Sequence, residues 1–281
     1  MKRLSKPAHR EIPLVIDATP SAGVGVKSAV RVMQVFEFFD QLQRDARVSE
    51  VVEFLGFPQS STSALLKSLV QTGYLEYLPA TRTYIPTPRV ALLGSWIGGS
   101  PIRDGSIGRM MDELSAETGE AIVLACSSGI YAKYIHVVEA TRLIRMHVPI
   151  GSQRFLAWSA MGVALISHMS DDAIRLLVRR TNAEAPSRQK AIDVNQTLAY
   201  VEQFRKRGYF FSRGLVTPGA GMICVRLPPN STSPDRPLAL GIGALVDTIE
   251  KQEARFVRLM RNAIARYINN DLSKPAARAK R

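Results

Sequence analysis

The first quarter of the chain shows three apolar stripes at helical spacing, separated by short polar breaks. Apolar residues recur over residues 27–43, which predicts a first helix. A shorter stripe predicts a second helix over residues 48–55, with Ser49 as its N-terminal cap and Gly56 at its end. The third apolar stripe follows directly, and the polar side opposite it has almost no charged residues.

This third stripe lies in FPQSSTSALLKSLVQTGYL, residues 57–75. Pro58 suits the first turn of a helix, because its missing N–H costs nothing there. The leucines of the stretch recur at helical spacing and form one buried side. Gly73 then predicts the end of the helix.

Two short runs after this helix have the composition of strands. Residues 74–78 and 83–85 predict a hairpin with its turn at residues 79–82. Three helices followed by a hairpin predict a winged helix-turn-helix over residues 26–87. The strongly apolar stretch that follows predicts a linker helix within residues 88–100, packed against another surface.

From residue 101 onward, strands and helices mix in an order typical of an α+β domain, in which helices cover an antiparallel sheet. Helices are predicted at residues 102–118, 159–169, 171–179, 193–207 and 248–270. Strands are predicted at residues 121–126, 131–137, 143–148, 209–212, 222–227 and 238–245. This second domain is predicted to span residues 101–271. Residues 1–25 are predicted to be a flexible tail and residues 272–281 a basic tail.

Composition fits two globular domains and a polyanionic partner. The chain has 281 residues, 46% of them hydrophobic and 22% charged. Its formal net charge of +13 favours a partner such as nucleic acid. Residues 97–281 carry +10 of that charge, so the excess does not lie mainly in the predicted DNA-binding domain.

Other sequence features argue against several classes of site. No apolar run reaches the length of a membrane span, and the N-terminus lacks a hydrophobic signal core, which predicts a cytoplasmic protein without a membrane partner. Cys126 and Cys224 lie in apolar contexts and are expected to be reduced and buried. The histidines show no metal-ligand spacing, so neither a metal nor a cofactor is predicted.

The side of the third helix opposite its leucines is polar but almost uncharged. The candidate DNA contacts on or beside it are Gln59, Ser60, Ser61, Ser63, Ala64, Lys67 and Ser68. Hydroxyl and amide groups can hydrogen-bond base edges or phosphates, and an alanine methyl can touch a thymine methyl. Arg82 in the hairpin turn adds a cation. A polar surface of a protein–protein module is the alternative interpretation.

Six blocks of sequence resemble the IclR (isocitrate lyase regulator) family of bacterial transcription factors. In the first domain they are SAVRVMQVFEFF, VVEFLGFPQSSTSALLKSLVQTGYLEY and TYIPTPRVALLG. In the second they are MDELSAETGEAIVLACSSGIYAKYIHVVEA, PIGSQRFLAWSAMGVALI and FRKRGYFFSRGLVTPGAGMICVRLP. The resemblance implies a GAF-like effector-binding domain, a homodimer or a dimer of dimers, and genes regulated by small organic or aromatic acids. A dimer implies a pseudo-palindromic operator of double-stranded DNA.

The chain departs from the family's usual pattern at several positions. Family members often carry Arg at the position of Ala64, which suggests a different operator here. A common histidine is replaced by Ala157, a frequent acid by Leu215, and a frequent cysteine aligns with Met222. The pocket is therefore expected to be more apolar than usual, with Arg213 as the partner of an anion.

The loop and helix start around residues 158–162 are the best candidate for an effector site, because small residues allow close approach and a helix N-terminus favours a carboxylate. The candidate effector-binding residues are Trp158, Ser159, Ala160, Met161, Gly162, Arg213, Leu215, Met222 and Cys224. Each of them could instead simply fill the core.

An enzyme is not expected. No histidine has a readable Ser or Cys partner, and neither a nucleophile elbow nor a phosphate-binding loop is present. The alternative to a DNA-binding regulator is a ligand-sensing oligomer with weak or specialised DNA binding that acts mainly through protein partners.

Overall fold

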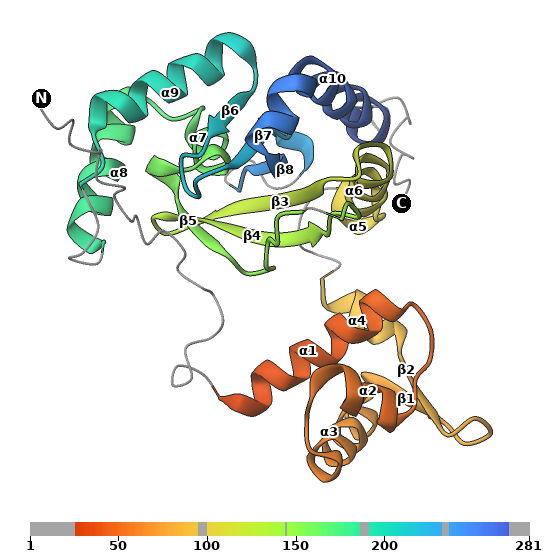
Figure 1. The fold of residues 1–281 in the computed structure, drawn as a ribbon. Helices are drawn as coiled ribbons and strands as arrows, with labels where there is room; N and C mark the ends of the chain where they lie inside the picture. The colour runs from red at the N-terminus through yellow and green to blue at the C-terminus, as the bar shows by residue number, and fades with distance from the viewer. Residues whose placement is uncertain (1–25, 95–99, 144, 186–190, 232–235, 270–281) are drawn as a thin grey trace, which may run out of the picture. The chain divides into compact units, whose positions relative to one another are not determined.

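The structure is a computed structural model that describes residues 26–94, 100–143, 145–185, 191–231 and 236–269 (Figure 1). The chain divides into two compact units, one within residues 20–97 and the other mainly from residue 98 onward. Helices and a hairpin in the first unit, and an antiparallel sheet with helices in the second, confirm the predicted α+β class. The predicted tails at residues 1–25 and 272–281 lie outside the described residues.

The first unit has the predicted helices and hairpin. They are α1 (Lys27–Leu42), α2 (Val48–Leu55), α3 (Gln59–Gln71), β1 (Leu75–Leu78) and β2 (Thr83–Pro86). Apolar side chains from all three helices and both strands meet in one core, formed by Val35, Phe38, Phe39, Ala46, Val51, Leu66, Leu69, Leu75 and Tyr84. Because Leu66 and Leu69 belong to this core, the opposite side of α3 is free to meet a partner.

The predicted cap of α2 is wrong. Arg47, not Ser49, occupies the N-cap position. The backbone N–H of Arg47 donates to the Glu50 carboxylate at 2.9 Å. A side chain in the first turn of the helix therefore accepts the hydrogen bond of the N-cap residue. The predicted end is confirmed, because Gly56 has the left-handed φ of 67° that closes a helix.

The linker helix is shorter than predicted where the structure describes it. It runs as α4 (Pro88–Leu93) and is followed by Gly94, and residues 95–99 lie outside the described residues. Two contacts fix α4 to the end of α3. The Thr87 hydroxyl donates to the Gly73 carbonyl at 2.6 Å, and the Arg89 guanidinium lies 4.8 Å from the centre of the Tyr74 ring.

A six-stranded antiparallel sheet forms the centre of the second unit, in the order β5-β4-β3-β8-β7-β6 (Figure 1). Its strands are β3 (Ala121–Ser128), β4 (Tyr131–Val138), β5 (Gln153–Phe155), β6 (Phe210–Arg213), β7 (Ala220–Arg226) and β8 (Leu238–Leu245). The long strands β3 and β8 lie at its centre, so β5 and β6 are the edges.

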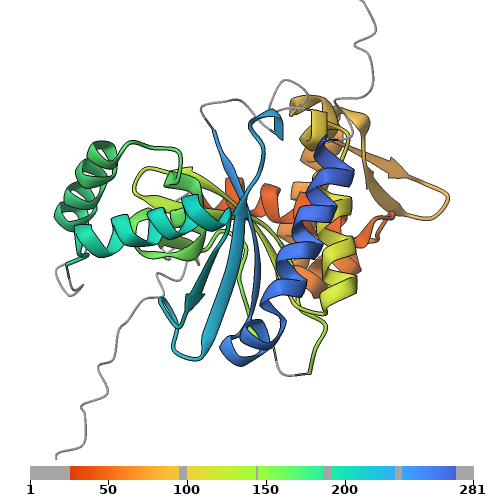
Figure 2. The same ribbon diagram turned by 90° about the horizontal axis from the view of Figure 1, so that it is seen from above.

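Two helical layers cover the two faces of this sheet (Figure 2). One layer contains α5 (Ser100–Arg103), α6 (Ser106–Thr118) and α10 (Val246–Ile264), which continues as a π-helix over Ala265–Asn269. The other contains α7 (Ala160–Ile166), α8 (Asp171–Glu184) and α9 (Val194–Arg207), with a 3₁₀ turn at Leu156–Trp158 before α7. A second 3₁₀ turn at Pro229–Ser231 follows β7.

Alternating side chains of the strands supply the two cores. On β3, Val123 enters the core beneath α7, whereas Ile122 and Leu124 enter the core beneath α6 and α10. On β8, Ala239 enters the core beneath α7 and Leu240 enters the core beneath α6 and α10. This period of two is what an antiparallel sheet covered on both faces requires.

Two predicted elements are wrong. The helix predicted over residues 102–118 breaks at Gly105, whose φ of 74° is left-handed, and so forms α5 and α6. The strand predicted over residues 143–148 is absent at residues 143 and 145–148, and the short strand β5 forms further along instead. Residue 144 lies outside the described residues.

Candidate DNA-binding surface and effector cavity

The polar side of α3 presents the side chains that the sequence predicted as DNA contacts. Gln59, Ser60, Ala64, Lys67 and Ser68 are exposed, while Ser61 and Ser63 are half-buried. Ser60, Ala64 and Lys67 lie opposite the buried leucines. Ser61, Ser63 and Ser68 flank them, and Gln59 lies at the N-terminal end of the helix. All seven side chains are at least partly accessible.

The hydroxyl groups on this face differ in what they can offer to DNA. Ser61 donates to the Pro58 carbonyl at 2.9 Å, and Ser68 donates to the Ala64 carbonyl at 3.0 Å. Each of these oxygens keeps its acceptor positions for an amino group of a base. Ser60 makes no hydrogen bond with the described part of the chain, so its hydroxyl can donate as well as accept.

The hairpin carries one cation at its tip. Arg82 is exposed and has a φ of 58°, in the left-handed region that non-glycine residues rarely occupy. The hydroxyls of Thr81 and Thr83, on either side of it, lie 2.5 Å apart. This contact links the two residues that flank Arg82 at the end of the wing.

The second unit contains a cavity of about 450 Å³. Its walls include the loop over residues 146–149, the middle of β4, strand β5, the start of α7 and the β6–β7 loop over residues 216–219. The lining residues are Tyr134, Met146, His147, Val148, Pro149, Arg154, Ser159, Ala160, Ser212, Val216, Thr217, Pro218, Gly219, Ala220, Gly221, Met222 and Leu245. Most of these side chains are apolar, and this volume suits a small metabolite.

A few polar groups face this apolar lining. Burial raises the pKa of Tyr134 to about 12, so its hydroxyl stays protonated and can donate at neutral pH. The guanidinium carbon of Arg154 lies 5.9 Å from the centre of the Tyr134 ring. One N–H of Arg154 donates to the Gln153 carbonyl at 2.8 Å, which leaves other donors of the guanidinium for a ligand.

The cavity wall carries little charge. Among the described residues that line it there is no aspartate or glutamate, and Arg154 is the only one with a fixed positive charge. His147 also lines the cavity, with its Nδ1 atom 3.5 Å from a carboxylate oxygen of Glu139. An anion in the cavity therefore meets a cation without a competing carboxylate in the wall.

Three of the predicted effector residues line this cavity. They are Ser159, Ala160 and Met222. The Ser159 oxygen accepts from the Gly162 N–H at 3.1 Å, so the start of α7 is capped by its own side chain. The Gly162 N–H is therefore already satisfied within the chain.

The other predicted residues lie behind or beside the cavity. Met161, Gly162 and Cys224 are buried in the core. Trp158 packs against Tyr200, with ring centres 6.1 Å apart. Leu215 is partly buried and packs against the same core.

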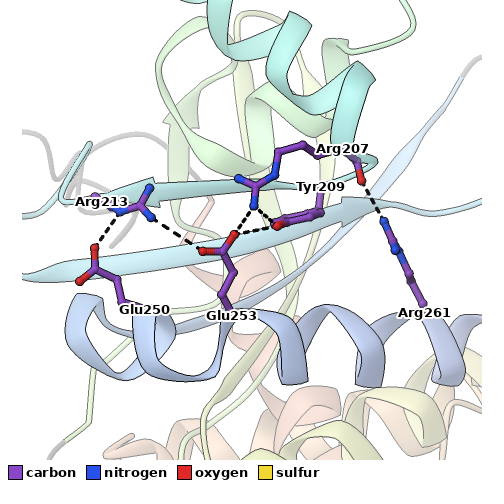
Figure 3. Close-up of polar contacts among 6 residues, drawn as sticks. All are labelled: Arg207, Tyr209, Arg213, Glu250, Glu253 and Arg261. Carbon is purple, nitrogen blue, oxygen red and sulfur yellow. Dashed lines mark hydrogen bonds and ion pairs between the residues drawn. The ribbon is translucent and has the colours of Figure 1, made fainter.

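Arg213 lies on the other face of the sheet, and Figure 3 shows its partners. Its Nε atom lies 2.8 Å from Glu250, and its Nη2 atom lies 3.8 Å from Glu253, both on α10. Its neighbour Ser212 lines the cavity, because successive residues of a strand point to opposite faces. The cation beside the cavity is Arg154, which the sequence analysis did not select.

Cys224 is buried as expected, whereas Cys126 is more exposed than expected. The Cys224 thiol is fully buried and donates to the Ala160 carbonyl at 3.1 Å. Burial raises the pKa of both thiols, and Cys126 is half-buried. The described residues contain no group of His, Cys, Asp and Glu that could hold a metal, and none of their helices is long and apolar enough to cross a membrane.

A winged helix-turn-helix, in one chain with a sheet domain that contains a cavity of metabolite size, is typical of the class of ligand-responsive DNA-binding proteins. Comparison with known families agrees. Residues 28–79 match the IclR helix-turn-helix domain, and residues 101–269 match the bacterial transcriptional regulator IclR C-terminal domain. The chain therefore belongs to the IclR family and is a DNA-binding transcriptional regulator with a C-terminal effector-binding domain.

Curated relatives are distant but cover most of the chain. It is 25% identical over 207 residues to the transcriptional repressor IclR of Escherichia coli (strain K12), a match that covers 73% of this chain and 75% of the relative. It is 24% identical over 204 residues to the transcriptional repressor AllR of the same strain, covering 68% and 71%.

Solved structures show the same fold. The effector domain of a transcriptional regulator IclR from Acinetobacter sp. ADP1 is 30% identical, with a TM-score of 0.54, and the match covers 61% of this chain and 96% of that one. The IclR regulator from Alicyclobacillus acidocaldarius is 20% identical, with a TM-score of 0.52, covering 86% and 98%.

Proposed function

We propose that a small monocarboxylic acid with an apolar body is the effector, and that its binding changes the affinity of a homodimer for a pseudo-palindromic operator. The observation that carries this proposal is Arg154 beside Tyr134, in a cavity with no acidic side chain among the described residues that line it. A carboxylate would accept hydrogen bonds from both residues, and the charged bond is the stronger one.

The rest of the lining supports the apolar part of that ligand. Met146, Val148, Met222 and Leu245 surround the remainder of the cavity. An acid with an aromatic or aliphatic body would cover these side chains and release the water that they contact. A neutral molecule of the same shape would gain the apolar contacts but not the bond to Arg154.

On the DNA side, we propose that the serine-rich face of α3 enters the major groove and that Arg82 contacts the phosphate backbone. The single cation of this α3 face, Lys67, limits the affinity of one copy. A dimer with two such faces compensates by repetition. We further propose that the protein acts in the cytoplasm, where the chromosome lies, and that it regulates rather than catalyses.

The first test is the binding of benzoate, phenylacetate and hexanoate, each compared with its neutral amide, by isothermal calorimetry. We expect at least one acid to bind, and Arg154→Gln to weaken that acid by about tenfold or more, because a charge-assisted hydrogen bond contributes about 1.5–3 kcal/mol. The same substitution should change binding of the matching amide much less.

Arg180→Gln is the matched control, because Arg180 pairs with Glu184 on α8 and does not line the cavity. It should bind every probe as the unmodified protein does. If Arg154→Gln weakens the acid and its amide equally, Arg154 shapes the cavity but does not recognise a carboxylate. If no acid binds and an amide does, the proposed effector class is wrong.

A further inference from the structure

We infer that Arg142 and Arg213 are positioning residues that couple the two walls of the effector cavity to the helix pair α6 and α10. Neither side chain lines the cavity. Each holds one of its loops to the far layer of the sheet. This inference rests on the proposed function, since it concerns how an effector bound in the same cavity would change the positions of α6 and α10.

Arg142 anchors the chain shortly before the first wall, residues 146–149. Residue 144, between the two, lies outside the described residues. The Nε atom of Arg142 lies 2.5 Å from Glu120, a carboxylate whose side chain is only 4% exposed, and its Nη2 donates to the Thr118 carbonyl at 3.0 Å. The Thr141 N–H donates to the Gly119 carbonyl at 3.1 Å. All three contacts meet the C-terminal end of α6, where carbonyls and a carboxylate favour a cation.

The second wall, residues 216–219, is anchored at both of its ends. Before the loop, Arg213 pairs with Glu250 and Glu253 on α10 (Figure 3). After it, the Gly219 carbonyl accepts from the Val246 N–H, at the first residue of α10, at 3.0 Å. A shift of either end of this loop toward a ligand would therefore pull on α10 or break one of these contacts.

Glu253 gives the second anchor a shared partner. It also accepts from Tyr209 at 2.7 Å and pairs with Arg207, at the opposite end of β6 (Figure 3). Burial opposes ionisation of Glu253, but its bonds to Tyr209 and Arg207 prevail and lower its pKa, so it remains a carboxylate at neutral pH. Both ends of the edge strand are thus held by the same turn of α10.

The two anchors end on helices that are joined to each other. Glu113 of α6 lies 2.5 Å from Arg266 and accepts from the Tyr267 hydroxyl, also at 2.5 Å. Arg255 of α10 donates to the Glu117 carbonyl of α6 at 2.8 Å. Hydrogen bonds and ion pairs therefore connect the cavity walls to α10 and α10 to α6. Helix α6 is the first long helix after the linker in the chain.

This arrangement gives the coupling a physical basis. A ligand shifts an equilibrium only by its difference in affinity for two conformations. An acid that draws the two walls together favours the conformation in which α6 and α10 follow them. Without an anchor, the loop can close on the acid while the helices stay in place, so binding survives and the response is lost.

The test uses the full-length protein, its selected operator fragment and the acid among benzoate, phenylacetate and hexanoate that binds most tightly. Arg213→Gln, Arg142→Gln and Glu250→Gln should bind that acid within about threefold of the unmodified protein. The change in operator affinity caused by the acid, typically about 5–150-fold in such systems, should fall at least fivefold in the two arginine variants and less in Glu250→Gln.

Arg180→Gln again serves as the control and should keep the full response. If Arg142→Gln does not fold, Arg213→Gln and Glu250→Gln still test the second anchor. A full response in a folded arginine variant would overturn the inference for its anchor, and so would a large loss of acid binding, because the residue would then serve the cavity itself. If the unmodified protein shows no response to the acid, the proposed function fails and the inference fails with it.

Discussion

At the scale of single residues, Gly162 is the position where the backbone leaves the least room. The sequence suggested that a glycine here allows a ligand to approach. The structure shows an approach of another kind, because a Cβ atom at this position would lie 2.2 Å from the Leu156 carbonyl oxygen. The glycine is needed so that α7 can pack against the turn before it.

We therefore expect Gly162→Ala to destabilise the second unit by about 3 kcal/mol, at the upper end of what overpacking costs. Gly108→Ala is the matched control, because Gly108 also lies inside a helix, α6, with nothing within 4 Å of the added atom. It should stabilise the protein by about 0.5–1 kcal/mol. Urea denaturation followed by circular dichroism measures both, and equal effects would contradict the packing argument.

Arg154 and Arg213 show what the sequence could and could not reveal at this scale. The predicted strand ends at residue 212, and Arg213, just beyond it, is expected to be the partner of an anion in the pocket. In the structure β6 continues through Arg213, and the alternation that places Ser212 at the cavity sends Arg213 to α10. The alternation of apolar and polar residues could not identify Arg154 as a cavity residue, because β5 has only three residues and shows no clear pattern.

At the scale of elements, long segments with a clear period were predictable and segments fixed by distant contacts were not. Helix α2 and strand β8 have the predicted bounds. Strand β5 forms because the Tyr134 N–H donates to the Ser152 carbonyl and the Gly151 N–H donates to the Tyr134 carbonyl, at 2.9 and 2.8 Å. These bonds bring the chain beside β4, and no local pattern encodes them.

The anchor between Arg142 and α6 predicts a pH-dependent stability. Burial raises the pKa of Glu120, and Arg142 opposes that shift. In Arg142→Gln the opposition is gone, so the pKa of Glu120 rises further. A carboxyl with a raised pKa stabilises the fold while protonated and loses that contribution as pH rises through the folded-state pKa.

Arg142→Gln should therefore lose more stability at about pH 7.5 than at about pH 5. We expect a loss of about 1–2 kcal/mol at the higher pH, below the usual cost of breaking a buried pair, because Arg142 is 47% exposed. Thermal denaturation at the two pH values measures the difference. Arg180→Gln should show no such dependence, and a loss in Arg142→Gln that is equal at both pH values would exclude Glu120 as its cause.

At the scale of the whole molecule, the distribution of charge bears on how DNA is bound. Residues 1–96 carry a net charge of only +3. Phosphate contacts supply most of the affinity in protein–DNA complexes, so one weakly charged winged helix should bind weakly. Strong binding then requires two copies on one DNA molecule.

We expect a DNA fragment with two half-sites to bind at least about a hundredfold more tightly than one with a single half-site. Inserting half a helical turn between the half-sites should remove most of that gain, because the second copy then faces the wrong side of the duplex. Electrophoretic mobility shifts at fixed salt measure both. Equal affinity for one and two half-sites would favour the ligand-sensing oligomer that acts through protein partners.

The burial of the two cysteines has a practical consequence for following this protein at work. Thiol reagents attack the thiolate, and burial both hinders access to Cys126 and Cys224 and raises their pKa values. A single cysteine introduced at an exposed site of the first unit, such as Glu53, would carry a spin label or fluorophore almost alone. The distance between two such labels in an assembled protein then reports directly how the two reading helices separate or converge when an acid is added.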